Sequence, residues 1–85
     1  MIFTKVEKKA IIQVIAVGTK ATGQQLNQSK LQKLCNDIGI ISQYEIQELE
    51  RMSIFTENEL FTILQFNNSL EKSLFFQKIL REHNL

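Results

Sequence analysis

Residues 27–38 read NQSKLQKLCNDI, and this stretch decides the fold class. Its apolar side chains recur at the i, i+3, i+4, i+7 spacing that places them on one face of a helix. These residues are Leu31, Leu34, Cys35 and Ile38. Asn27 is a preferred N-cap residue, and Gly39 can adopt the left-handed conformation that ends many helices. We therefore predict an amphipathic helix over residues 28–38 that turns Cys35 toward the core.

Start signals for further helices lie on both sides of this stretch. At four places a Ser, Thr or Asn is followed three residues later by Glu, which is the pattern of a capping box. The pairs are Thr4 with Glu7, Ser42 with Glu45, Thr56 with Glu59 and Asn68 with Glu71. These signals predict helices over about residues 5–22, 43–52 and 57–66, and a last helix from about residue 69 onward.

Two of these starts also carry a hydrophobic staple, in which an apolar residue before the cap pairs with one in the first turn. The pairs are Ile41 with Ile46 and Phe55 with Leu60. A staple fixes the angle at which the chain enters a helix. We therefore expect these helices to turn sharply on one another.

Composition and periodicity together indicate one all-α domain over residues 1–85. The chain is 44% hydrophobic and has no Pro, and no segment shows strand-like alternation. The helix over residues 5–22 is apolar around most of its circumference, which is typical of a central, buried helix. We predict a compact bundle of about five helices with this one at its centre.

Charge is distributed unevenly along the chain. Residues 1–40 hold six lysines and two carboxylates, and residues 41–71 hold six glutamates and one arginine. The formal net charge of the whole chain is only +1. We interpret this pattern as a dipolar surface whose halves complement each other, and not as a field for nucleic acid or an anionic membrane.

The residue types give little material for catalysis. His83 is the one histidine and lies near the end of the chain, where we expect a solvated side chain. Cys35 is the one cysteine, so it can form neither a disulfide within the chain nor a thiolate zinc site. No Gly-rich phosphate loop occurs. We expect no enzyme activity and no cofactor.

The N-terminal stretch matches the pattern of a signal peptide only in part. Residues 1–23 have its outline, but Glu7 lies in the part that should be basic and Gln13 interrupts the apolar part. The apolar stretch is also too short to span a bilayer. We therefore expect a cytoplasmic protein without membrane contact.

Residues 34–49, LCNDIGIISQYEIQEL, suggest a helix-turn-helix and hence DNA binding as an alternative function. The spacing from Gly39 to Ile46 is one residue too long for that motif, and three glutamates on the second helix would repel phosphates. The alternative is therefore a small DNA-binding accessory protein that uses the basic N-terminal half. Its candidate contacts are Lys5, Lys8, Lys9, Lys30 and Lys33.

The order of caps and helices resembles the TerB-like (tellurite resistance) family of small bacterial helical domains. The stretches that carry the resemblance are residues 4–23, TKVEKKAIIQVIAVGTKATG, residues 27–40, NQSKLQKLCNDIGI, residues 41–52, ISQYEIQELERM, and residues 56–80, TENELFTILQFNNSLEKSLFFQKIL. The resemblance implies a bacterial protein associated with stress or tellurite resistance.

The resemblance also implies a metal site, whose acidic positions have been replaced here. In the family the first long helix ends in an Ala-Asp-Gly-type turn, and a further acidic residue follows in the next helix. Thr22, next to Gly23, stands at the aspartate position, and Lys30, three residues after Asn27, stands at the second acidic position. A hard divalent cation needs carboxylate oxygens. We therefore predict that the metal site is lost.

The last predicted helix carries more apolar residues than one face can bury. The resemblance would place a second acidic turn and a further helix after this one, so we expect the last helix to lack neighbours that would cover it. We therefore expect a non-catalytic protein that acts through protein–protein contacts, with a homodimer through this helix as one form of contact. The expected anchors are Phe75, Phe76, Ile79 and Leu80.

Overall fold

The computed structural model describes residues 2–85. Within this range the helices are α1 (Lys5–Ala21), α2 (Gln28–Ile38), α3 (Gln43–Arg51), α4 (Glu57–Ile63) and α5 (Leu70–Glu82). A short 3₁₀ turn, η1 (Phe66–Asn68), lies between α4 and α5, and these residues contain no strand. The prediction of an all-α bundle of about five helices is confirmed.

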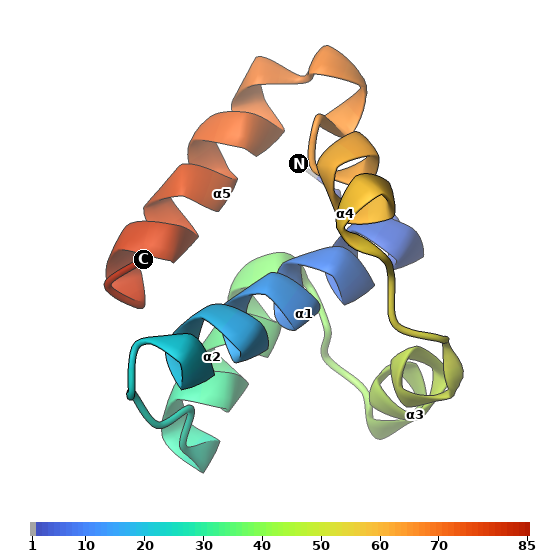
Figure 1. Ribbon diagram of the computed structural model, residues 1–85. Coiled ribbons are helices and arrows are strands. Elements are labelled where there is room, and N and C mark those ends of the chain that lie inside the picture. The colour runs from blue at the N-terminus through green and yellow to red at the C-terminus, as the bar shows by residue number, and fades with distance from the viewer. Residues whose placement is uncertain (1) are drawn as a thin grey trace.

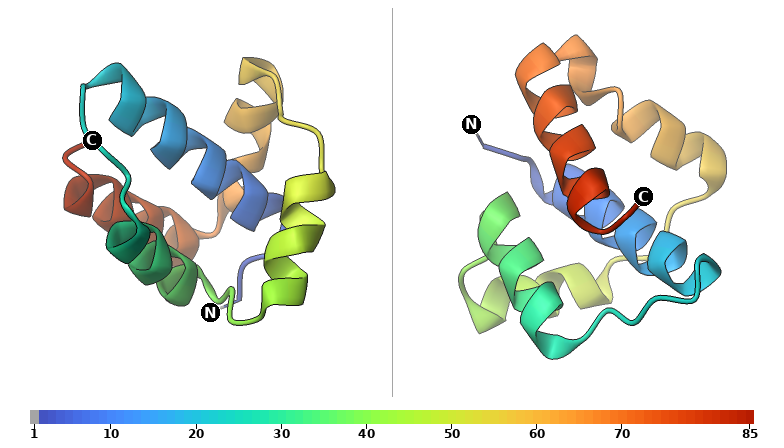
Figure 2. Two further views of the ribbon diagram at one scale, coloured as in Figure 1. Left: turned by 90° about the horizontal axis from the view of Figure 1, so that it is seen from below. Right: turned by 90° about the vertical axis from the view of Figure 1, so that its left-hand side faces the viewer.

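Helix α1 lies at the centre of the molecule, and the other helices surround it (Figure 1). Helix α5 crosses α1 and runs beside α2 (Figure 2), to which it is joined by the ion pair of Lys33 with Glu82 at 3.0 Å. Helix α3 lies beside the first turns of α1, where Lys5 and Lys8 form ion pairs with it. No helix within residues 2–85 has both the length and the apolar character needed to cross a bilayer.

The core lies where α2, α5 and η1 pack against α1. Ile11 and Ile15 of α1 are fully buried at its centre. The other buried apolar residues of this cluster are Phe3, Leu34, Ile38, Ile40, Leu49, Phe66 and Ile79. The ring centroid of Phe3 lies 5.7 Å from that of Phe66 and 5.8 Å from that of Phe75. These distances are in the range of favourable aromatic pairs, so the N-terminal segment is tied to η1 and α5.

Four predicted helix starts have the predicted caps. The side chains of Thr4, Asn27, Ser42 and Thr56 each accept a hydrogen bond from the backbone amide three residues later. In the boxes of Thr4 and Thr56 the glutamate also accepts from the cap amide. Local sequence suffices at these positions because both partners lie within one helical turn.

The connection from α4 to α5 differs from the prediction. Helix α4 ends at Ile63, and Phe66, Asn67 and Asn68 all have positive φ, between 53° and 64°. Asn68 therefore cannot cap α5, and Ser69 accepts from the Lys72 amide instead. Asn tolerates this left-handed region, whereas Phe rarely adopts it. Burial of the Phe66 ring in the core compensates for its backbone strain.

Gln13, the polar residue inside the apolar stretch of α1, holds the connection between α3 and α4. Its Nε2 donates to the carbonyl of Phe55, and its Oε1 accepts from the Phe55 amide, both at 2.8 Å. The side chain thus satisfies both backbone groups of one residue, in the way a neighbouring strand would. A residue that interrupts the apolar pattern therefore fixes the entry to α4.

Candidate functional site

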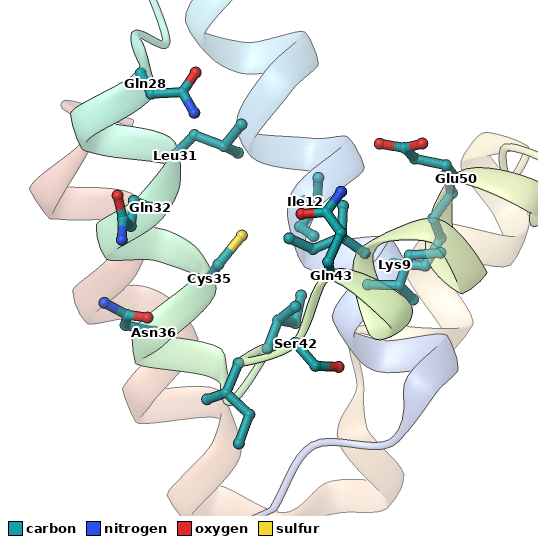
Figure 3. Close-up of a pocket in the computed structure, with 14 residues that line it drawn as sticks. Lys9, Ile12, Gln28, Leu31, Gln32, Cys35, Asn36, Ser42, Gln43 and Glu50 are labelled. Carbon is teal, nitrogen blue, oxygen red and sulfur yellow. The ribbon is translucent and has the colours of Figure 1, made fainter.

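An apolar groove lies between α2 and α3, and α1 forms its floor (Figure 3). Its volume is about 440 Å³. This is within the range of about 300–1,000 Å³ that is typical of ligand pockets. The apolar side chains that line it are Ile12, Leu31, Cys35, Ile40, Ile41, Ile46 and Leu49.

The groove exists because α2 and α3 carry apolar faces that are wider than α1 can cover. In α2, Leu34 is buried in the core, whereas Leu31 and Cys35 are only half-buried and face the groove. In α3, Leu49 is buried and Ile46 is half-buried. Each wall therefore has one edge in the core and one edge in the groove. The prediction that Cys35 turns toward the core holds in part, since it packs against the core cluster as well.

The rim of the groove is polar but almost uncharged. On the α2 side it consists of three carboxamides four residues apart, Gln28, Gln32 and Asn36. On the opposite side, Ser42 and Gln43 are joined by two charged residues, Lys9 and Glu50. Neither Lys9 nor Glu50 forms an ion pair with another residue of the range 2–85.

Ile41 stands at the mouth of the groove and is 85% exposed. The predicted staple between Ile41 and Ile46 is therefore not closed, because a side chain so exposed does not pack. Burying an isoleucine side chain stabilises a protein or a complex by about 1.5–3 kcal/mol. The isolated chain does not gain this stabilisation, because Ile41 is exposed to water. A partner molecule that buries Ile41 would gain it on binding.

Burial favours the protonated form of the thiol in the α2 wall of the groove. It raises the pKa of Cys35, and no basic side chain acts against this shift. A thiol with a raised pKa is a weak nucleophile, because the thiolate is the reactive form. The lining of the groove therefore suits binding better than covalent chemistry.

Three of the five lysines of the DNA-binding alternative, Lys5, Lys8 and Lys33, are neutralised by carboxylates. Lys5 Nζ lies 2.6 Å from Glu48, and Lys8 Nζ lies 3.1 Å from Glu45. Hydrogen bonding to Glu48 raises the pKa of Lys5, and hydrogen bonding to Lys8 lowers the pKa of Glu45. The basic start of the chain thus pairs with the acidic middle, and these pairs hold α3 against α1.

Lys33 and the other two lysines of that alternative, Lys9 and Lys30, do not form one basic surface. Lys33 lies 2.8 Å from Asp37 and 3.0 Å from Glu82, and hydrogen bonding to these two carboxylates raises its pKa. Lys9 lines the groove, whereas Lys30 is exposed at the start of α2. A phosphate backbone would meet isolated cations here and not a continuous basic face.

Glu7 has a structural role that its place in a capping box did not reveal. Its carboxylate is 2.8 Å from Lys72 Nζ of α5, and the residue is only 7% exposed. Burial alone would raise the pKa of Glu7, but hydrogen bonds from Lys72 and from the Thr4 amide outweigh it and lower the pKa below its ordinary value. Lys72 also lies 5.9 Å from the Phe3 ring centroid. The pair therefore joins α1 to α5 as a charged link.

His83 is not the solvated side chain that we predicted. It is only 9% exposed, at the C-terminal end of α5. Burial lowers the pKa of His83, the Glu82 carboxylate opposes this shift, and Lys30 and Lys33 reinforce it. The correction follows from the packing of α5 beside α2, which covers the imidazole with residues far away in sequence.

The four anchors expected on α5 face inward, which corrects the predicted contact surface. Ile79 is 2% exposed, and Phe75, Phe76 and Leu80 are half-buried and pack against the core cluster. The cover comes from Phe3 and Phe66, which fold over this face. The exposed apolar residues of α5 are Leu70 and Leu74, near its start.

The positions that would carry a metal in TerB-like proteins are occupied by groups that satisfy one another. The Thr22 hydroxyl donates to the Gly18 carbonyl at 2.9 Å and accepts from Gln24 Nε2 at 2.7 Å. Asn27 caps α2 by accepting from the Lys30 amide at 2.9 Å, and Gly23 has a φ of 73°. Residues 2–85 contain no group of three or more His, Cys, Asp or Glu side chains that could hold an ion.

Comparison of the chain with models of protein families, with curated proteins and with solved structures finds no match. A functional proposal therefore rests on the geometry of the chain itself. That geometry offers an apolar groove with a mostly uncharged polar rim and a strongly exposed isoleucine at its mouth.

Proposed function

We propose that this protein is a non-catalytic helical domain that acts through protein–protein contacts, and that the groove between α2 and α3 is its contact surface. The observation that best supports this proposal is Ile41, which is almost fully solvated beside the apolar groove lining. Exposed apolar patches with polar rims are typical of interaction sites on small proteins. An apolar side chain that becomes fully desolvated in a complex can act as an anchor for a partner.

The resemblance to TerB-like proteins adds a cellular setting to the proposal. The order of caps and helices supports a stress-associated or tellurite-resistance role in a bacterial cytoplasm. The acidic positions of that family are replaced by Thr22 and Lys30. We therefore place the role of the domain in contacts with a protein and not in binding an ion.

DNA binding has weaker support than protein binding. Lys5, Lys8 and Lys33 are already paired with carboxylates of the same chain. Binding to phosphates would require these pairs to break, which reduces the gain from counterion release. Binding of duplex DNA that weakens steeply with salt would nevertheless favour this alternative.

The proposal is tested by the size of the complex that the protein forms in extracts of its native host. We expect the tagged chain to elute as a larger assembly, and Ile41→Ser to return it to the elution volume of the purified chain. Ile54→Ser is the matched control, since Ile54 is also an exposed isoleucine but lies outside the groove. An assembly that is equally large with Ile41→Ser would contradict the proposed contact surface.

A further inference from the structure

We infer that the groove binds one amphipathic helix of a partner protein, and that the flank of this helix that faces the α2 rim is uncharged. The inference rests on the proposed function, because it names the partner chemistry of the same groove. Three features support it: the shape of the groove, the charges on its rim and the position of Ile41.

The shape of the groove matches a helix. Helix α1 forms the floor, and α2 and α3 form two walls, so a further helix would complete a four-helix arrangement (Figure 3). The rim residues of α2 run from Gln28 to Asn36, which is a length of about 12 Å at ~1.5 Å per residue. That length corresponds to about two helical turns, which is enough for anchors at i, i+3 or i+4, and i+7.

The charges of the rim specify the partner's flank. The three carboxamides of α2 can each donate and accept hydrogen bonds, so Gln, Asn, Ser or Thr side chains of a partner could pair with them. A partner Lys or Glu over this row would lose hydration without gaining an opposite charge. On the opposite rim, Lys9 and Glu50 are not paired with each other, so charged partner residues could be accommodated there. Complementarity therefore favours an uncharged flank on the side of the partner helix that faces α2.

Ile41 distinguishes a helix from a small apolar ligand. A small ligand that lies against Ile12 of the floor and Leu31 of the α2 wall would leave the solvated end of Ile41 in water. A helix that spans both walls would cover the mouth and the floor together. This is the arrangement in which an exposed isoleucine at the mouth contributes to binding.

A second copy of this chain offers a poor match to the groove. The exposed apolar face of α5 has two leucines, Leu70 and Leu74. Glu71 and Lys78 are exposed next to them, so the flank of this face is charged. The other described helices expose large apolar residues only singly or far apart: Val6 and Val17 on α1, Tyr44 on α3 and Phe61 on α4. None of these helices offers a row of apolar anchors, so the structure favours a different protein as the source of the helix.

The test is selection from a displayed library of short helices on the intact protein. Each helix has Leu at i, i+3, i+4 and i+7, and each flanking position is Gln, Ser, Glu or Lys. We expect the selected helices to carry Gln or Ser on the flank that faces α2. Their affinity should fall about tenfold or more with Ile41→Ser, as expected for loss of an anchor, and remain unchanged with Ile54→Ser.

A change of rim charge gives a second, independent readout. The double variant Gln32→Lys, Asn36→Lys alters only exposed residues of α2, so the fold should be retained. We expect it to shift the selection toward helices with Glu on the flank. Gln77→Lys on the exposed face of α5 is the control and should leave the selection unchanged.

Several results would overturn the inference. One is enrichment by the wild-type protein of helices with charged residues on the flank that faces α2, and another is failure to enrich any helix over scrambled sequences. Binding of a fatty-acid probe that protects Cys35 from a maleimide, without helix binding, would identify a small-ligand site. Self-association that Ile41→Ser abolishes would identify a second copy as the occupant. If the host complex still depends on Ile41 in any of these cases, the proposed function stands and only the partner chemistry is wrong.

Discussion

The inner face of α5 and the groove between α2 and α3 are both apolar, but only the first is covered by the chain itself. Phe75 and Ile79 of α5 lie against Phe3 and other core residues. Leu31 and Ile46 face a groove that no described segment fills. The connection between α2 and α3 is too short to cross the groove, whereas residues 2–4 and η1 fold over α5. An apolar helix face therefore indicates a binding surface only where the chain cannot reach it.

The largest expected effect comes from breaking the covered side. Ile79→Ala should lower the free energy of unfolding by about 2–5 kcal/mol, the usual cost of truncating a buried isoleucine. Ile41→Ser should change it by less than about 0.5 kcal/mol, as is usual for exposed positions. Urea unfolding followed by circular dichroism measures both values. Equal costs for the two variants would remove the contrast between the two regions.

The next largest effect concerns the charged link between α1 and α5. Lys72→Met leaves the buried Glu7 carboxylate without its partner and should cost about 1–3 kcal/mol of unfolding free energy. Adding Glu7→Gln should recover part of this loss, because the uncompensated charge is then gone. Equilibrium unfolding of the two single variants and the double variant measures the coupling. A coupling energy of zero would mean that the ion pair does not join the helices.

A decrease in pH should lower the free energy of unfolding, because His83 of the α5 C-terminus and Glu7, the partner of α5, then take up protons. Both groups have a lowered pKa in the folded protein, so the unfolded chain binds more protons and stability falls as pH decreases. The loss should begin below about pH 6.5 for His83 and continue below about pH 4.3 for Glu7. His83→Gln should remove the first part of this dependence. Urea unfolding at a series of pH values measures this dependence. If His83 were solvated, the wild-type protein and His83→Gln would have the same pH dependence of the free energy of unfolding.

The smallest effect concerns the ion pairs that hold α3, one wall of the groove. Glu45→Gln with Glu48→Gln should lower the melting temperature only slightly, and the difference should shrink as salt is added. Amide hydrogen exchange in α3 should increase, while exchange in α5 should not change. Equal acceleration in both helices would show that the wall is not a separate, weakly held element.

The helices could be predicted from sequence because their signals are local. Asn27 and Gly39 mark both ends of α2, and the capping residues of α1, α3 and α4 act within one turn. The end of α4 could not be predicted in this way. Phe66 adopts a positive φ because the distant Phe3 and Phe76 hold its ring in the core.

The candidate site could be predicted only in part. Periodicity identified the apolar residues of α2 and α3 but did not give the angle between these helices, which decides whether Leu31 is buried or faces a groove. Periodicity also does not show which segments cover α5. The apolar residues of α5 that exceed one face therefore suggested an exposed surface. The one local feature that marks this side of α2 is the row of Gln28, Gln32 and Asn36 beside Leu31, which carries no charge, whereas Lys30, Lys33 and Asp37 lie elsewhere on the same helix.

The central claim is that the groove between α2 and α3 contacts a protein, and photo-crosslinking in cells of the native host tests it most directly. A benzophenone amino acid replaces Gln32 on the groove rim in one variant and the exposed Gln65 near η1 in another. We predict a covalent adduct with one protein from position 32, none from position 65, and loss of the adduct with Ile41→Ser. No protein adduct from position 32, or equal adducts from both positions, would contradict the claim.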